Sequence, residues 1–596
     1  MLLFIIAKLR CVKKVKNQPQ NSYKIIFNWL FFSIELVIFF PNLLLSANAQ
    51  IITQPVTPKD PTVLPTPQPL PETQPLPPLE ELLPTPGQIP SILQPSLEQI
   101  PGTITVTQFD VIGSTVFSQT ELAKTLEPFT KHPISFAELL KAQEAISQLY
   151  VKSGYITSGA FIPPQELKNG VVKIEVIEGE VESINVTGLQ RLKAGYLRSR
   201  LALATKAPLN QNRLLESLQM LQLDPLIANL SAELAAGSRP GVSTLEIKVR
   251  EAQAFSTQLN FDNQRSPSVG SIRRQLQISH NNLLGFGDRF HVGYINTDGS
   301  NSLDDLSYSF PINPYNGTIS LNYSLSNSNI LEKPFNTLDI QSESHNYQIT
   351  YRQPLKQTPK EEFTIGLTAS RQESQTSLLN IPFPLSIGAN EQGETKISAL
   401  RFFQEYTQRN TQQVFALRSQ FNWGINALNS TINDKAPDSQ FITWRGQTQY
   451  LRLLTPDTTL LLRSDLQLAD RPLVPLEQLS IGGQQSIRGY RQDQLLADNG
   501  LFASAELRTP ILKIPKWQTT VQLAPFFDFG TVWNHSDSEV KIPKQTLSSV
   551  GLGLRFLVAN NFNARIDWGI PLVKLDRTGN TLQENGIYFT VEYKLF

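Results

Sequence analysis

The amino-acid sequence predicts a membrane β-barrel of about 16 antiparallel strands, preceded by two small α/β modules of order β-α-α-β-β. Three observations predict this fold: an N-terminal export signal, a strand–helix pattern that occurs twice within residues 103–252, and polar–apolar alternation over residues 253–596. The composition agrees, because 40% of the 596 residues are hydrophobic and only 17% are charged. No run of about 20 apolar residues follows the N-terminus, which excludes a helical membrane protein. The net charge of +1 argues against nucleic-acid binding.

Residues 1–49 are predicted to be a signal peptide. Lys and Arg side chains precede a long apolar run, and a small-residue pattern at Ala47 and Ala49 follows as the cleavage site. An uncleaved anchor helix is the alternative, and Glu35 within the apolar run disfavours it. Cleavage also removes Cys11, the only cysteine of the chain, so the exported protein would carry no thiol. Such a chain suits an oxidising compartment outside the inner membrane.

Residues 50–180 divide into a spacer and the first α/β module. Residues 50–102 carry a proline every few positions, which favours an extended linker over a packed core. The first module is expected over residues 103–180. Ser135 followed by Glu138 predicts a capping box at the start of a helix, and Gly154 predicts its end. Strands are expected over residues 105–111, 155–161 and 171–176.

The second module is predicted over residues 181–252, because the same pattern recurs there. Residues 184–188 repeat the strand and glycine of residues 109–113. A helix is expected over residues 210–223, and the strand over residues 244–249 is followed by Arg-Glu. The alternative is a single domain whose two halves resemble each other by accident.

The barrel is predicted over residues 253–596, where apolar and polar side chains alternate in many short runs. At about 21 residues per strand and connection, this length accommodates about 16 strands. A soluble β-sandwich is the alternative, which the length and the charges on the polar face disfavour. Only a closed barrel satisfies every backbone group in lipid. The last alternating run ends with Leu595, rather than Phe596, in phase with Tyr593.

Three local motifs carry a resemblance to a known family. The first module contains Leu149-Tyr150, then Gly154-Tyr155-Ile156, then Ile162-Pro163-Pro164-Gln165 before Gly170-Val171-Val172. The barrel segment contains Ile487-Arg488-Gly489-Tyr490 and, later, Phe526-Phe527-Asp528-Phe529-Gly530. With the signal, the Pro-rich lead and the two modules, the chain resembles the two-partner secretion transporters of TpsB type. These are the haemolysin/filamentous-haemagglutinin secretion–activation proteins, whose periplasmic modules are POTRA domains.

The resemblance implies that a long extracellular loop folds back into the barrel, where its Arg488 meets Asp528 of a lumen-lining strand. An arginine withdrawn from water needs a carboxylate, and its planar fork suits one bidentately. The alternative is an exposed Arg488 and an unpaired Asp528. The candidate lumen residues are Ile487, Arg488, Gly489 and Tyr490 of the loop and Phe526, Asp528 and Gly530 of the strand.

The implied function is transport across the outer membrane, with the modules in the periplasm. The implied partners are an unfolded exoprotein with an N-terminal secretion domain, outer-membrane lipid and, during biogenesis, the barrel-assembly machinery. An extended client could add a strand to a module. The family commonly carries a pore-plugging N-terminal helix, for which the Pro-rich stretch is poorly suited. The candidate client-binding residues are Phe136, Leu140, Tyr150, Val171, Ile174 and Val176.

No enzyme chemistry is evident. The sequence holds no Walker loop, no GxSxG and no HExxH motif, and its five His residues lack metal-ligand spacing. We therefore expect neither a catalytic residue nor a cofactor. The main rival function is that of a barrel-assembly insertase of the same superfamily, which usually carries more modules. A passive porin would lack the modules, and an enzyme on a barrel would need a catalytic constellation.

Overall fold

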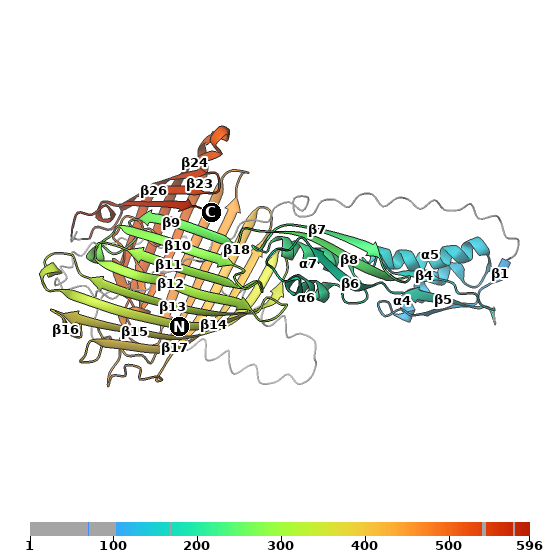
Figure 1. Cartoon of the computed structure of the whole chain (residues 1–596), viewed down its shortest axis with the longest axis horizontal. Coiled ribbons are helices and arrows are strands. Elements are labelled where there is room, and N and C mark those ends of the chain that lie inside the picture. The colour runs from blue at the N-terminus through green and yellow to red at the C-terminus, as the bar shows by residue number, and fades with distance from the viewer. Residues whose placement is uncertain (1–69, 71–102, 167–168, 539–543, 576–578, 596) are drawn as a thin grey trace. The chain divides into compact units, whose positions relative to one another are not determined.

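The computed structural model describes residue 70 and residues 103–166, 169–538, 544–575 and 579–595. These residues form two small α/β modules and a closed β-barrel (Figure 1). The predicted signal peptide, with Ala47 and Ala49, lies outside the described residues, as does the Pro-rich segment apart from Leu70.

The first module has a three-stranded sheet of order β2-β5-β4 and a separate pair of short strands, β1 and β3. Strand β5 is central, parallel to β2 and antiparallel to β4. Its elements are β1 (Thr103–Thr105), β2 (Gln108–Ile112), α4 (Gln119–Leu126), β3 (Pro133–Ser135), α5 (Phe136–Lys152), β4 (Gly159–Phe161) and β5 (Val171–Ile177).

Helix α5 begins as the sequence predicts. The Ser135 side chain accepts from the backbone N–H of Glu138, and the Glu138 carboxylate accepts from the backbone N–H of Ser135 at 2.7 Å. Both contacts satisfy N–H groups that the first helical turn leaves without partners. Gly154 follows the helix with φ +89°, a conformation that favours glycine. The buried face of α5 consists of Leu139, Ala142, Ile146 and Tyr150.

Two strands of this module are shorter than predicted. The strand expected over residues 155–161 is restricted to β4, because the N–H of Ser158 bonds to the carbonyl of Tyr155 and closes a turn first. The strand expected over residues 105–111 is split into β1 and β2. Residues 103–105 pair with β3, whereas β2 pairs with β5, so the chain changes partner between them.

The second module repeats the β-α-α-β-β order, with a sheet of order β6-β8-β7. Gly113 and Gly188, matched by the sequence repeat, both have positive φ. A Cβ added to either would lie within 2.4 Å of a carbonyl oxygen of the module's last strand, at Val176 and Val249 respectively. Only glycine therefore allows this close approach in each module. The elements are β6 (Glu180–Thr187), α6 (Ala194–Ala204), α7 (Gln211–Gln222), β7 (Ile227–Ala236) and β8 (Val242–Glu251).

The barrel has sixteen spanning strands and closes by pairing β27 with β9. The two-residue β16 (Ile381–Pro382) pairs with the end of β15 and does not span. The spanning strands are β9 (Phe255–Asp262), β10 (Arg273–Asn281), β11 (Arg289–Asn296), β12 (Ser300–Pro311), β13 (Thr318–Asn329), β14 (Ile340–Gln357), β15 (Glu361–Leu378), β17 (Glu394–Arg409), β18 (Gln413–Ile425), β19 (Ile442–Leu453), β20 (Thr459–Ala469), β23 (Asn499–Ile514), β24 (Thr519–Trp533), β25 (Gln545–Val558), β26 (Phe562–Pro571) and β27 (Ile587–Lys594).

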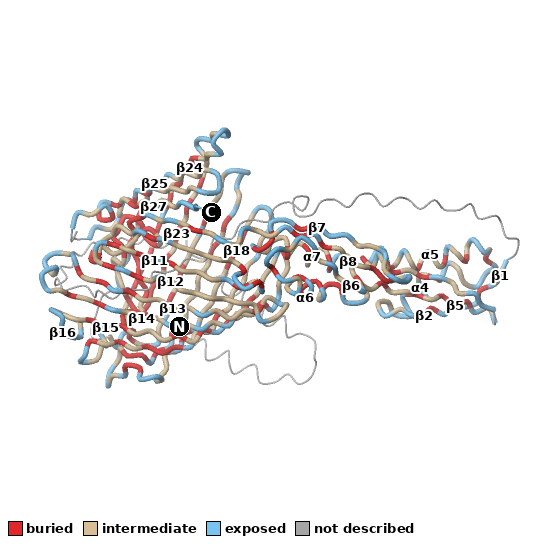
Figure 2. The backbone as a smooth tube through the Cα atoms, in the orientation of Figure 1, coloured by how far each residue is buried: buried red, intermediate tan, exposed pale blue. Residues whose placement is uncertain are grey.

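Alternation along each strand separates a lipid face from a polar lumen. On β26, Ile566 and Trp568 are exposed on the outside, whereas Asp567 between them is buried inside. Figure 2 shows buried, intermediate and exposed positions mixed along the barrel strands. Because every strand pairs on both sides, the barrel leaves no open sheet edge to the membrane. The number of strands is even, so the chain enters and leaves the barrel at the same end.

Candidate functional site in the barrel lumen

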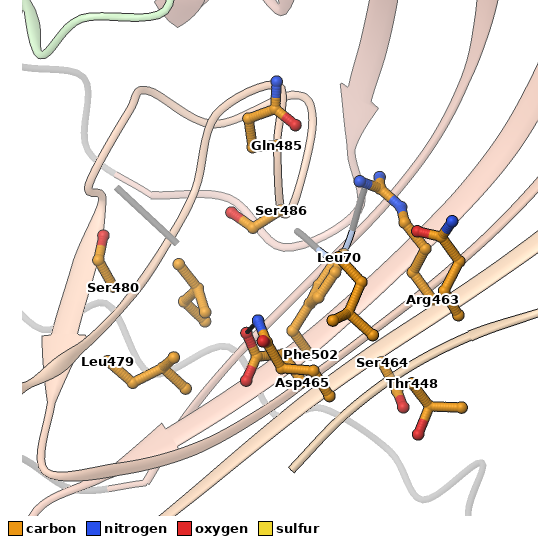
Figure 3. Close-up of a pocket in the computed structure, with 13 residues that line it drawn as sticks. Leu70, Thr448, Arg463, Ser464, Asp465, Leu479, Ser480, Gln485, Ser486 and Phe502 are labelled. Carbon is orange, nitrogen blue, oxygen red and sulfur yellow. Dashed lines mark hydrogen bonds between the residues drawn. The ribbon is translucent and has the colours of Figure 1, made fainter. Parts of the chain in front are cut away.

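A long connection between β20 and β23 folds back into the barrel. It contains the short 3-10 helix η4 (Pro475–Glu477) and the hairpin of β21 (Leu479–Ile481) with β22 (Leu495–Ala497). We call residues 470–498 the lumen loop. Its apolar side chains pack against wall strands in one buried cluster, which comprises Leu479, Ile481, Ile487, Tyr490, Ala497, Phe502, Val532 and Leu547. Figure 3 shows Leu479 of the loop and Phe502 of β23 from this cluster.

Arg488, at the tip of the lumen loop, is fully buried at 0% exposure. Its Nε and Nη2 atoms donate to the two carboxylate oxygens of Asp528, both at 2.8 Å. The backbone N–H of Arg488 donates to the same carboxylate at 3.1 Å. This is the bidentate geometry that makes an arginine–carboxylate pair strong. The structure therefore brings the loop arginine and the strand aspartate together.

Glu506 on β23 is a second partner that sequence reasoning missed. It accepts from Arg488 Nη1 at 2.6 Å, from Arg508 Nε at 2.7 Å and from Arg565 Nη2 at 2.8 Å. Arg565 Nε also lies 2.6 Å from the carboxylate of Asp567. The lumen ion cluster, as we name it, has three arginines and three carboxylates: Arg488, Arg508, Arg565, Glu506, Asp528 and Asp567.

The cluster balances its charges inside the barrel, where unpaired charges are costly. A sequence signal for it existed. Glu506 and Arg508 are two residues apart on one strand, as are Arg565 and Asp567 on another, so each pair faces the lumen. The alternation of side chains along a strand, however, does not predict that both pairs lie at the same height in the barrel as Arg488.

An aromatic ring and a glycine of β24 also contact the loop tip around Arg488. The centre of its guanidinium lies 3.3 Å from the centroid of the Phe526 ring, a cation–π arrangement. Gly530, two residues beyond Asp528, leaves room for the loop, since an added Cβ would lie 2.4 Å from the Ile487 side chain. Phe526 and Gly530 of the strand motif thus contact the arginine and the isoleucine of the loop motif.

Gly489 allows the loop tip to approach the wall at backbone distance. Its φ is +97°, and an added Cβ would lie 3.2 Å from backbone atoms of Gly569 and Pro571. Its N–H donates to the hydroxyl of Tyr588 at 2.9 Å, and that hydroxyl donates in turn to the carbonyl of Tyr490. Tyr588 is fully buried. This tyrosine therefore ties two neighbouring loop residues to β27.

Further contacts tie the loop to the outer rim and to the opposite wall. The Tyr490 hydroxyl lies 2.8 Å from the carbonyl of Ser548. Arg491 forms ion pairs with Glu332 at 2.8 Å and with Glu584 at 3.3 Å, both in other connections between strands. At the loop's start, Glu477 pairs with Arg401 of β17. The lumen loop is thus anchored to other parts of the barrel at Glu477 near its start and at Tyr490 and Arg491 near its tip.

Comparison with known proteins assigns the chain to a family. The family model described as haemolysin secretion/activation protein ShlB/FhaC/HecB matches residues 241–556, and the model of the ShlB-type POTRA domain matches residues 104–179. The chain belongs to the haemolysin secretion/activation protein family. It is an outer-membrane transporter of two-partner secretion, with its POTRA modules in the periplasm. The assignment favours transport over the rival function of a barrel-assembly insertase.

Individual relatives agree with this assignment. The chain is 26% identical over 512 residues to the outer membrane transporter CdiB of Escherichia coli, covering 82% of this chain and 83% of that protein. It is 23% identical over 480 residues to the heme/hemopexin transporter protein HuxB of Haemophilus influenzae, covering 76% and 80%. The solved structure of CdiB from Escherichia coli superposes with a TM-score of 0.66 at 21% identity, covering 87% of this chain and 95% of that one. The latter likeness shows the shared fold.

The six residues suggested for client binding on the first POTRA module are not all accessible. Tyr150, Ile174 and Val176 belong to the hydrophobic core, so a client cannot reach them on the folded module. The apolar residues of a helix and a strand face inward here because they cover each other. Phe136 and Val171 are exposed, at 37% and 36%, and Leu140 is half-buried.

Tyr150 instead closes the core of the module. Its hydroxyl donates to Glu178 Oε1 at 2.8 Å, and Glu178 also accepts from the backbone N–H groups of Thr115 and Val116. Burial of the carboxyl acts to raise the pKa of Glu178, but hydrogen bonds from the side chain and backbone of Thr115, from Tyr150 and from the backbone of Val116 outweigh it and lower the pKa. Glu251 caps the corresponding turn of the second module. It accepts from three backbone N–H groups, those of Gln190, Arg191 and Leu192.

Within the described ranges, no group of three or more His, Cys, Asp or Glu side chains could hold a metal ion. Among the same residues, no helix is long and apolar enough to cross a membrane.

Proposed function

We propose that this transporter binds an unfolded exoprotein through its POTRA modules and conducts it through the barrel to the cell surface when the lumen loop moves. One observation carries the proposal: the tip of the lumen loop is held in place largely by ion pairs and hydrogen bonds. Such contacts can be exchanged for contacts with water or with a polar client backbone, whereas a fully packed apolar plug has no alternative partners.

Client uptake by strand addition needs an accessible sheet edge. In the first module β5 is central, so the edges are β2 and β4. On β2, the carbonyl of Val111 accepts a hydrogen bond from the Gln119 side chain. On β4, the backbone N–H of Ala160 donates to the Ser147 hydroxyl. Both edges are therefore partly occupied. In the second module Arg198 bonds to Ile184 O on β6.

Strand β7 offers the best edge for a client. It has ten residues, and within the described part of the chain it pairs only with β8 and no side-chain hydrogen bond caps its outer edge. We therefore place strand addition on β7, and we propose the exposed Phe136 and Val171 as additional apolar contacts on the first module. A photocrosslinker at Glu233 on β7 should then trap the exoprotein during secretion, whereas one at Phe161 on β4 should trap much less.

The client is proposed to be a large exoprotein with an N-terminal secretion domain, encoded beside the transporter. Lipid and the barrel-assembly machinery are proposed as further partners of the barrel. The decisive experiment deletes the gene and compares secretion with outer-membrane content. Loss of one exoprotein from the medium, with normal levels of other barrels, supports transport. A general loss of outer-membrane barrels would instead identify an insertase.

A further inference from the structure

Three strands of the barrel end in the same short pattern, a proline followed by a large aliphatic residue. Strands β12, β14 and β23 are the fourth, sixth and twelfth spanning strands, so each runs toward the periplasm and ends there. The pattern is Pro311-Ile312 on β12, Pro354-Leu355 on β14 and Pro510-Ile511 on β23. The three aliphatic side chains are exposed, at 44%, 60% and 57% respectively.

In β14 and β23 the proline also marks a β-bulge. The register of β14 with β15 shifts between Pro354 and Lys356, and that of β23 with β24 shifts between Pro510 and Leu512. Proline offers no N–H to the ladder, and a bulge turns the following side chains. On β23, Ile511 and the adjacent Leu512 are both exposed, although neighbours in a regular strand face opposite sides. The periplasmic end of this hairpin therefore presents two apolar side chains together.

An aromatic ring and two cations follow these apolar side chains in the chain. Trp517 of the 3-10 helix η5 (Pro515–Trp517) is 64% exposed, and tryptophan is enriched where acyl chains meet headgroups. Lys513 pairs with Asp457 of the neighbouring turn, and both side chains are about half exposed. Lys516 is exposed and forms no ion pair within the described ranges. Two lysines thus face one carboxylate, so a positive charge remains beside the tryptophan.

We propose that the periplasmic end of the β23–β24 hairpin is a binding site for an anionic phospholipid of the periplasmic leaflet. Ile511 and Leu512 contact the acyl chains, Trp517 lies at their boundary with the headgroup, and Lys516 binds the phosphate together with Lys513. A lipid with a net negative charge fits better than a zwitterionic one, whose own ammonium group repels the lysines. The site depends on the place of the barrel in the membrane and not on the proposed route of the client.

The first test measures the lipid preference of the full-length protein in detergent. The immobilised protein is equilibrated with equal amounts of fluorescent phosphatidylglycerol and phosphatidylcholine, and the retained ratio is determined. A lysine near an anionic surface contributes a factor of about five, and Asp457 already offsets part of the charge of Lys513, so we expect a preference of about tenfold for phosphatidylglycerol. The double variant Lys513→Gln with Lys516→Gln should abolish this preference.

The matched control removes two lysines from the connections at the other end of the barrel. Lys544→Gln with Lys574→Gln changes the net charge equally, and it should keep the preference within about twofold of the unmodified protein. Heat-modifiable migration in gels confirms that both double variants fold. An equal loss in the two double variants, or no preference in the unmodified protein, would overturn the proposal.

The second test locates the lipid without altering a lysine. In bilayers that contain brominated phosphatidylglycerol, the fluorescence that Trp517→Phe removes should be quenched more strongly than in bilayers with the same share of brominated phosphatidylcholine. Trp568, which is 52% exposed on the lipid face of β26, should be quenched equally by both lipids. Equal quenching of Trp517 by both would show contact with lipid of any charge only and refute the site. Neither test measures secretion, so a failure here leaves the proposed transport function untouched.

Discussion

Asp528→Asn is the substitution that most directly tests the lumen ion cluster. The change keeps the shape of the side chain but removes its charge and replaces one acceptor oxygen by an NH2 group. Arg488 then loses one of two strong hydrogen bonds to this residue, and the new NH2 group faces the guanidinium. Glu506 still accepts from Arg488 at 2.6 Å, so the loop is weakened rather than released completely.

The magnitude follows from the burial of the pair. Both side chains are 0% exposed, so water does not compensate for the lost partner. Removing one member of a buried pair typically costs about 3–5 kcal/mol of stability. Because asparagine keeps one acceptor oxygen, we expect this variant to destabilise the closed loop by about 3 kcal/mol. A change of about 3 kcal/mol corresponds to a factor of about one hundred between closed and open loop. The open fraction should rise accordingly, and secretion should fall if closure of the loop is part of the transport cycle.

The assay is single-channel conductance in planar bilayers, together with secretion by cells that carry the variant. Asp262→Asn is the control, because the buried Asp262 also forms a bidentate pair, with the half-buried Arg273 on the neighbouring strand, without touching the lumen loop. Heat-modifiable migration in gels confirms that both barrels fold. Unchanged conductance and secretion in Asp528→Asn would refute the role of the pair.

The double variant Arg488→Asp with Asp528→Arg examines the role of Glu506. A simple two-residue pair would recover activity when its charges are exchanged. In the lumen ion cluster, an aspartate at position 488 would face Glu506, so the exchange should restore little secretion. Full recovery would show that Glu506 contributes nothing to the position of the loop.

Three further predictions concern neighbouring contacts. Gly569→Ala adds a Cβ that would lie 2.5 Å from the backbone N of Gly489, so it should open the loop and raise conductance as Asp528→Asn does. Tyr588→Phe removes the hydroxyl that accepts from Gly489, and it should have a smaller effect of about 1–2 kcal/mol in bilayer recordings. In the first POTRA module, the lowered pKa of Glu178 stabilises the fold at pH values above the ordinary glutamate pKa of about 4.3. Stability should fall as pH drops through the lowered pKa. Protection of the Thr115 amide in hydrogen exchange, corrected for intrinsic rates, measures this loss, and constant protection would contradict it.

The sequence alone determined the local elements and the kind of molecule. The capping box of Ser135 and Glu138 marks the start of α5, because it depends only on residues three positions apart. Strand alternation identifies the lipid and lumen faces, because side chains change face with every residue. The resemblance carried by the motifs around Arg488 and Asp528, which are 40 residues apart, implied a contact between them.

Only the tertiary structure decided which residues share one place. Glu506 joins Arg488 because the register between β23 and β24 and the path of the lumen loop bring them to one level of the barrel, and no local pattern records that register. Tyr150 and Val176 look like surface candidates in isolation, yet helix and sheet bury them against each other.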